Sequence, residues 1–256
     1  MQDLRRLACG LEYDGTHYNG WQIQSHAPSI QFSLNQAVSR VADEAVGCIG
    51  AGRTDSGVHA TGQVAHFDTH AERTPRSWLL GINSNLAEDV NVLWVRPVID
   101  AFHARFSAVG RTYRYVILNR PVRSALERHR VWWVRQRLDL DAMKAAARCL
   151  TGVHDFSSFR ASACQSKSPV REIRRLEIRR AADRITIECE ANAFLHHMVR
   201  NIVGSLVRVG RGEADAEWVA SLLAERDRRL ADITAPAAGL CLTHVDYPVE
   251  FNLPNA

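Results

Sequence analysis

The chain has 256 residues, of which 46% are hydrophobic and 23% charged, and its formal net charge at pH 7 is +4. This composition is typical of a globular protein and excludes a low-complexity chain. No apolar run approaches the roughly 18 residues that a membrane-spanning helix needs. The segment Met1 to Arg6 lacks an apolar signal core, so we expect a cytoplasmic protein. The length suits one large domain or two intimate lobes.

Six cysteines are spread along the chain without a C-x-x-C pair. A disulfide framework or a zinc ribbon would cluster them, so we expect free or buried thiols. The basic residues are arginines except for Lys144 and Lys167. Because arginine suits bidentate contacts with phosphate, the composition allows an anionic partner without requiring one.

The first half of the chain predicts strands and helices in alternation. Residues 7–13 alternate as a strand does and stop at the turn signal Asp14-Gly15. Ser29 is a good N-cap for a helix with one apolar stripe, formed by Ile30, Leu34, Val38, Val41 and Ala45. The pattern then predicts a strand over 63–68, a helix over 77–83, and strands over 90–95 and 111–118.

The second half continues this mixed order. We expect a helix over 139–150, closed by Gly152, a strand over 185–189, a helix over 194–207, a helix around Trp218, and a last strand over 240–245. Such an order predicts an α+β fold with an antiparallel-rich sheet and helices on one face. The arginine-rich residues 120–137 are the expected junction between an N-terminal lobe (about 1–119) and a C-terminal lobe (about 138–256) of a single catalytic unit, 1–256.

The stretch GAGRTDSGVHATGQVAHFDT (50–69) is the most distinctive in the chain. Gly52 and Gly57 fit G-x-x-x-x-G, but a Walker loop needs Lys-Ser/Thr where Val58 and His59 stand. The dinucleotide-binding motif G-x-G-x-x-G, started at Gly50, would need glycine at position 55, where the sequence has aspartate. A plain turn capped by Asp55 would explain the Asp and the Gly but not Arg53. We therefore interpret Asp55 as a reactive carboxylate displayed on a turn, kept ionised by a nearby arginine.

A metal site is a weaker interpretation of the same stretch. The candidate ligands near one another in sequence are Asp55, His59, His66 and Asp68. His59 and His66 are seven residues apart across a glycine, without the spacing of common metal motifs. His196 and His197, on an expected helix, would point about 100° apart. No metal site is expected.

Five segments, in this order, resemble the signature of the tRNA pseudouridine synthase A family. They are YDGTHYNGWQ (13–22), GRTDSGVHATGQVAHF (52–67), FHARFSAVGRTYRY (102–115), NAFLHHMVRNIVG (192–204) and TAPAAGLCL (234–242). The resemblance covers nearly the whole chain. It implies a pseudouridine synthase fold with two mainly antiparallel-sheet halves around a basic central cleft. It also implies a homodimer that acts on tRNA without a cofactor or a metal.

The resemblance also implies catalytic roles. Asp55 matches the family's catalytic residue, a nucleophile in the isomerisation of uridine to pseudouridine at family positions 38, 39 and 40 of the anticodon stem-loop. Tyr113 matches the tyrosine that stacks on the uracil and helps to remove the C5 proton. Arg200 matches the arginine that pairs with the catalytic aspartate. Leu240 matches an apolar wall of the uracil pocket.

Further residues match the family's RNA contacts. Arg53 matches the residue that enters the space left by a flipped base, where its planar guanidinium can stack and bind phosphate. The remaining expected contacts are Arg73, Phe102, His103, Ala104, Arg105, Phe106, Ala163, Cys164, Gln165, Ser166 and Lys167.

Two other functions stay open on the residues alone. A non-catalytic RNA-binding protein would lose at most some affinity when Asp55 is replaced. A metal-dependent nucleotide hydrolase would be sensitive to chelators.

Overall fold

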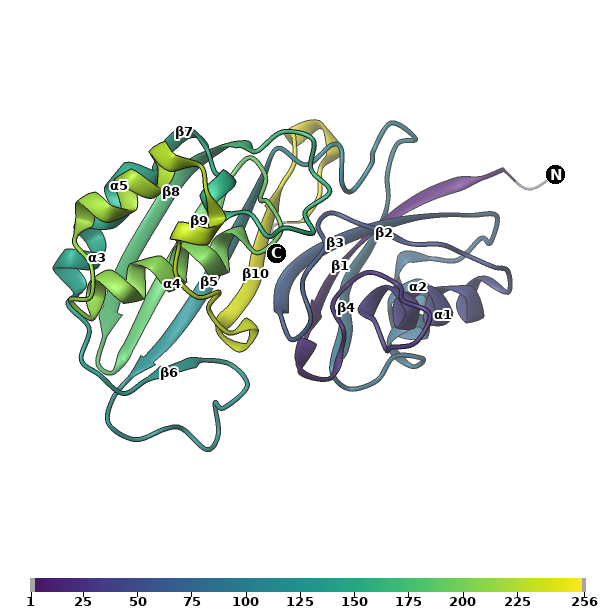
Figure 1. The fold of residues 1–256 in the computed structure, drawn as a ribbon. Coiled ribbons are helices and arrows are strands. Elements are labelled where there is room, and N and C mark those ends of the chain that lie inside the picture. Colours follow the sequence, from purple (N-terminus) through teal and green to yellow (C-terminus); the bar gives the residue numbers. More distant parts are fainter. Residues whose placement is uncertain (1–2, 255–256) are drawn as a thin grey trace. The chain divides into compact units, whose positions relative to one another are not determined.

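The computed structural model describes residues 3–254, which form two compact units (Figure 1). The first unit contains the residues up to Val109 and those from Cys241 onward, and the second contains Gly110–Leu240. Both units combine helices with a mostly antiparallel sheet. The predicted α+β class is therefore confirmed.

The first unit has a sheet in the order β4–β1–β3–β10. Strand β1 (Arg5–Tyr13) is antiparallel to both β4 (Val90–Pro97) and β3 (His59–Thr69). Strand β10 (Leu240–Asp246) runs parallel to β3, and the short β2 (Ile49–Gly50) runs antiparallel to it. Each predicted strand of this unit is present, and β3 begins four residues earlier than predicted.

Two helices complete the first unit. Helix α1 (Ile30–Ala42) starts as predicted after Ser29, whose hydroxyl accepts the Phe32 N–H over 3.4 Å. It ends at Asp43, which has a left-handed φ of 59°, so the predicted stripe stops before Ala45. Helix α2 (Pro75–Asn83) packs against α1 and β4.

The second unit has an antiparallel sheet in the order β5–β9–β8–β7. Its strands are β5 (Gly110–Asn119), β6 (Trp132–Val134), β7 (Gly152–Asp155), β8 (Val170–Ala181) and β9 (Arg184–Ala191). Strand β6 runs parallel to β5 and lies inside the segment that we expected to be a junction. Strands β6, β7 and β8 were not predicted.

Three helices pack together in the second unit, and one of them, α3, contacts β8 (Figure 1). Helix α3 (Leu140–Ala147) starts as predicted at its N-cap Asp139, and α5 (Ala216–Glu225) starts at Asp215. Helix α4 (Met198–Gly210) begins four residues later than predicted, because His197 has a left-handed φ of 62°.

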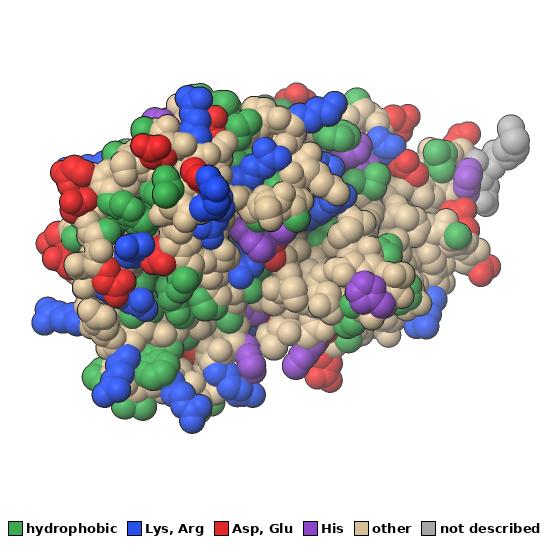
Figure 2. All heavy atoms as spheres, in the orientation of Figure 1, with side chains coloured by type: hydrophobic (Ala, Val, Ile, Leu, Met, Phe, Trp, Pro, Cys, Tyr) green, Lys and Arg blue, Asp and Glu red, His purple; other side chains and the backbone are tan. Residues whose placement is uncertain are grey.

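Short 3-10 helices join these elements at η1 (Gly15–His17), η2 (Arg148–Leu150), η3 (Ser157–Phe159), η4 (Arg228–Leu230), η5 (Ala237–Gly239) and η6 (Val249–Phe251). Figure 2 shows basic side chains next to acidic ones over the surface of the second unit. In its sheet, for example, Arg175 forms ion pairs with Glu188 at 2.9 Å and with Glu190 at 3.3 Å. Among residues 3–254, no helix is both long and apolar enough to cross a bilayer.

Candidate active site

Asp55 lies on the loop that joins β2 to β3. The loop turns at Gly57, whose φ of +77° favours glycine, and the Val58 N–H donates to the Asp55 carbonyl over 3.1 Å. The Asp55 side chain is half-buried, whereas Arg53 is exposed. The loop thus presents a carboxylate at the surface of the first unit with an arginine two residues before it.

Residues 13–22 hold this loop from one side. The Trp21 N–H donates to the Thr54 carbonyl over 3.0 Å, and the Gly57 N–H donates to the Tyr18 carbonyl over 3.2 Å. Inside the unit, the hydroxyls of Tyr13 and Thr54 are hydrogen-bonded over 2.9 Å. Burial raises the pKa of Tyr13, so its phenol is neutral in this buried network.

Gly20 makes the closest approach to the Asp55 loop. A Cβ atom at this position would lie 2.4 Å from the Thr54 carbonyl oxygen and 3.0 Å from the Asp55 carbonyl carbon. Gly20 also has a φ of +83°. The backbone of one segment therefore rests directly on the backbone of the other, which fixes Asp55 without using its side chain.

Gln63 of β3 holds the loop from the other side. Its side chain is fully buried, and its amide Nε2 donates to the Gly52 carbonyl over 2.8 Å and to the Tyr13 hydroxyl over 3.4 Å. Its Oε1 accepts the Gly52 N–H over 3.4 Å. A buried amide thus fixes the backbone directly before Arg53. Sequence reasoning gave no role to Tyr13, Gly20 or Gln63, although all three lie in the quoted segments.

The candidate histidines of this region have structural contacts. The Gly15 N–H donates to Nδ1 of His59 over 3.1 Å, and the Ala104 N–H donates to Nδ1 of His66 over 3.1 Å. Asp68 accepts two hydrogen bonds of 2.7 Å from the guanidinium of Arg6. These side chains support backbone and neighbouring strands in the first unit.

Tyr113 and Tyr115 lie on β5 in the second unit and point to the same side of the strand. Tyr115 is fully buried, and its hydroxyl donates to the Pro236 carbonyl over 2.7 Å. Tyr113 is 8% exposed and packs edge-to-face against Phe194, with ring centroids 5.0 Å apart. Both rings are therefore buried, and they differ in that Tyr115 is completely enclosed whereas Tyr113 keeps a small exposed fraction.

Arg200 lies in the first turn of α4 and is half-buried. Its Nε donates to the Ala235 carbonyl over 2.7 Å, and the Ala235 N–H donates back to the Arg200 carbonyl over 3.1 Å. Leu240, at the start of β10, is 5% exposed. The two last quoted segments, 192–204 and 234–242, are therefore joined through Arg200.

His196 and His197 precede α4 instead of lying on it. Their rings are 4.0 Å apart between centroids, so the expected divergence of about 100° is wrong. Both histidines lie in a turn before the helix, and the left-handed φ of 62° is at His197.

The expected RNA contacts outside the segment 102–106 are exposed or half-buried. Arg73 is exposed, and so are Ala163, Gln165 and Lys167. Cys164 and Ser166 are half-buried. Arg160 holds the backbone of the loop 163–167, because its Nη2 donates to the carbonyls of Cys164 over 2.7 Å and Ser166 over 2.8 Å.

In the segment 102–106, Phe102 and Ala104 are fully buried, whereas Phe106 is 76% exposed. Arg105 is also exposed, and its guanidinium carbon lies 5.5 Å from the centre of the Phe106 ring. The side chains that this segment offers to a ligand are therefore mainly those of Arg105 and Phe106.

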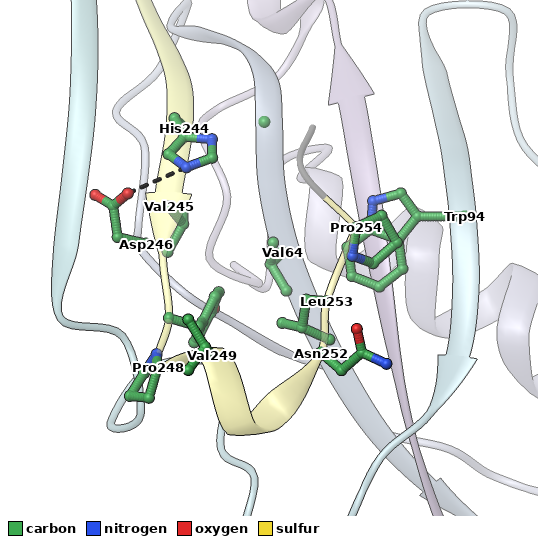
Figure 3. Close-up of a pocket in the computed structure, with 12 residues that line it drawn as sticks. Val64, Trp94, His244, Val245, Asp246, Pro248, Val249, Asn252, Leu253 and Pro254 are labelled. Atoms are coloured by element: carbon green, nitrogen blue, oxygen red, sulfur yellow. Dashed lines mark ion pairs between the residues drawn. The ribbon is translucent and has the colours of Figure 1, made fainter.

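A cavity of about 290 Å³ lies elsewhere in the first unit (Figure 3). It is lined by Gly62 and Val64 of β3, by Trp94 of β4, and by residues 244–249 and 252–254. His244 and Asp246 form an ion pair of 3.1 Å at its edge. None of the predicted site residues is among those that line it.

Comparison with known proteins agrees with the resemblance. The family model described as "tRNA pseudouridine synthase" matches residues 11–107 and 146–248. The chain is 52% identical over 248 residues to tRNA pseudouridine synthase A of Hydrogenovibrio crunogenus, covering 97% of this chain and 95% of that protein. It is 54% identical to the protein of that name from Methylococcus capsulatus, covering 97% and 92% of the two chains.

The protein of that name from Klebsiella pneumoniae is 50% identical over 254 residues, which cover 99% of this chain and 94% of that protein. The matched residues include the Asp55 loop, both segments that hold it, and the start of α4. The chain therefore belongs to the tRNA pseudouridine synthase family, and its enzymatic class is that of an isomerase.

Proposed function

We propose that this enzyme isomerises uridines in the anticodon stem-loop of tRNA, at family positions 38, 39 and 40, with Asp55 as the catalytic residue. The C1′–N1 bond of the nucleotide breaks and a C1′–C5 bond forms. C5 loses its proton and N1 gains one. The reaction is thus balanced without an external oxidant, reductant or phosphate donor.

The observation that carries this proposal is the way Asp55 is held. Its loop is fixed by backbone contacts from Gly20 and Trp21 and by the buried amide of Gln63. Such fixation restricts the position of the half-buried carboxylate. A carboxylate can attack C1′, attack the ring, or remove the 2′ proton, and each route needs this restricted position.

We further propose that Tyr113, Arg200 and Leu240 act on the same uridine. Tyr113 stacks on the uracil and assists removal of the C5 proton, while Arg200 pairs with Asp55. The hydrogen bond from Nε of Arg200 to the Ala235 carbonyl supports this role, because it orients the guanidinium. Leu240 forms an apolar wall of the uracil pocket.

Arg53 is proposed to enter the space that the flipped base leaves. Unstacking a base costs a few kcal/mol, and a planar guanidinium can replace part of the lost stacking. The exposure of Arg53 on the Asp55 loop supports this role. Arg73 and the loops 102–106 and 163–167 are the proposed further RNA contacts.

The direct test is Asp55→Asn, which keeps the shape of the side chain and removes its charge. We expect tRNA binding within about threefold of wild type and loss of pseudouridine formation by a factor of about 10⁴ in a single-turnover assay. Asp43→Asn is the matched control, because Asp43 is exposed and asparagine tolerates its left-handed φ of 59°.

Pseudouridine formed by Asp55→Asn at the wild-type rate would contradict the assignment. Turnover that stops on addition of a chelator would instead support a metal-dependent hydrolase. A chain that binds tRNA and never forms pseudouridine would be a non-catalytic RNA-binding protein.

We also propose that the enzyme acts in the cytoplasm as a homodimer. The support for both is its membership of the family. Light scattering of the purified protein at micromolar concentration should give twice the chain mass of 28.7 kDa. A single species at the mass of one chain would contradict the dimer.

A further inference from the structure

Four consecutive backbone N–H groups in the segment 103–106 are bound by side chains. The His103 N–H donates to Oγ of Ser107 over 3.0 Å, and the Ala104 N–H donates to Nδ1 of His66 over 3.1 Å. The N–H groups of Arg105 and Phe106 both donate to Nδ1 of His103, over 3.1 and 3.2 Å. The Nδ1 atoms of His66 and His103 thus accept hydrogen bonds from three of these four N–H groups.

The two histidines also pack together. His66 of β3 is 2% exposed, and its ring centre lies 4.6 Å from that of His103. His103 in turn stacks on Phe106, with centroids 4.4 Å apart and planes 30° apart. The exposed Phe106 ring is therefore packed on His103, which is packed on the buried His66 in the interior of the first unit.

Groups from several elements fix the base of this segment. Arg6 of β1 donates through Nη1 to the carbonyls of Asp100 over 2.5 Å and Phe102 over 3.0 Å. The Tyr247 hydroxyl donates to the Ala104 carbonyl over 2.6 Å. Arg6 and Tyr247 therefore hold carbonyls of this segment, while the imidazoles accept the N–H groups of residues 104–106.

We propose that His66 and His103 are positioning residues that aim Arg105 and Phe106 at tRNA, and that they do so only while their Nδ1 atoms carry no proton. An imidazole nitrogen accepts a hydrogen bond only in its unprotonated form. Protonation would place an N–H of the ring opposite a backbone N–H, so the hydrogen bonds that hold residues 104–106 would be lost. The inference rests on the proposed contact of residues 102–106 with RNA.

Burial of the two rings, together with the positive charges near them, favours the neutral form. The pKa of His66 is lowered to about 4, mainly by burial, and further by His103 and Arg6, while Asp68 opposes the shift. The pKa of His103 is also lowered, mainly by burial, with Arg6 and Arg105 acting in the same direction. At neutral pH both rings are therefore acceptors.

The test compares His103→Asn with His103→Leu. Asparagine places Oδ1 where it can accept the N–H groups two and three residues later, as in an Asx-turn, whereas leucine fills space without an acceptor. We expect both variants to raise KM for tRNA, His103→Leu by about tenfold and His103→Asn by about threefold, because only asparagine keeps an acceptor for the two N–H groups. Equal effects of the two variants would overturn the inference.

The dependence of KM on pH gives a second readout. Between pH 7.5 and 5, protonation of histidines should strengthen binding to phosphates if only charge mattered. We expect the opposite for the wild type, a rise in KM towards pH 5, and a smaller rise for His103→Asn. Superimposable profiles for the two proteins, measured at constant ionic strength, would contradict the role of the Nδ1 acceptor.

Arg105→Ala separates this inference from the proposed function. If KM for tRNA is unchanged in Arg105→Ala, the contact of this segment with RNA is wrong. If KM rises in Arg105→Ala but not in His103→Leu, the contact stands and the positioning role fails. Thermal melting of each variant confirms that the comparison is made between folded proteins. His66→Asn tests the positioning role of the second imidazole, which lies on β3, by the same measurement of KM.

Discussion

At the residue scale, Gly20 sets the tightest limit on the position of Asp55. We expect Gly20→Ala to destabilise the protein by about 1–3 kcal/mol, because both its φ and the nearby Thr54 carbonyl oppose a side chain. Since the displaced atoms belong to the Asp55 loop, the single-turnover rate should fall more than the affinity for tRNA. Thermal melting checks the expected loss of stability, and a single-turnover assay checks the expected loss of rate.

Gly47→Ala is the control for this prediction. A Cβ atom on Gly47 would meet no atom within 4 Å. The Gly47→Ala variant should therefore melt within about 2 °C of the wild type and keep its activity. A similar loss in both variants would show that glycine at position 20 has no special role.

The sequence predicts Asp55 as the catalytic residue, and this stays a prediction, whereas the residues that hold its loop could not be predicted. Asp55 stands in a short motif, so its neighbours along the chain identify it. Tyr13 and Gln63 reach the loop only because β1 and β3 pair with a register shift between Leu11 and Tyr13. Pairing across a sheet depends on register, and the irregularity between Leu11 and Tyr13 is not visible in the alternation of residues 7–13.

At the element scale, α4 is held against the segment 233–236. A Cβ atom on Gly204 would lie 1.9 Å from the Ile233 carbonyl oxygen. We expect Gly204→Ala to push this segment away from Arg200, lower the melting temperature by at least about 5 °C and reduce activity. Differential scanning calorimetry together with initial rates would test this.

Gly81→Ala is the matched control in a helix. Its Cβ would lie 3.0 Å from a methyl group of Val41, and a side chain can move where a backbone carbonyl cannot. Because alanine is favoured over glycine in helices by about 1 kcal/mol, this variant should be neutral or more stable. A greater loss in Gly81→Ala than in Gly204→Ala would contradict the argument.

Capped elements were predicted well, and irregular ones were not. Ser29 and Asp139 are local signals, and both helices begin where these residues indicate. Helix α4 was placed too early, because the apolar spacing continues through His197, whose left-handed backbone the sequence does not reveal. Strand β8 was missed because arginines dominate it and a register shift between Ile173 and Arg175 interrupts its alternation.

At the scale of the whole molecule, the buried His66 makes stability depend on pH. Its pKa is about 4 in the folded chain and near 6.5 when unfolded. Between these values the unfolded chain binds a proton that the folded chain does not. The free energy of unfolding should therefore fall as pH drops from about 6.5 to 4, by at most about 3 kcal/mol from this group.

Urea unfolding at several pH values tests this expectation. His66→Asn removes the titrating group, so its free energy of unfolding should change less across the same window. A slope equal to that of the wild type would show that other groups cause the acid dependence.

The parallel pairing of β10 with β3 has a consequence for biosynthesis. Cys241 and Leu242 pair with His59 and Ala60, directly after the loop that carries Asp55. A ribosome makes β3 early and β10 only after the whole of the second unit. The scaffold of the loop that carries Asp55 is therefore complete only once the last strand has left the ribosome, so a translation product that ends before β10 should not modify RNA.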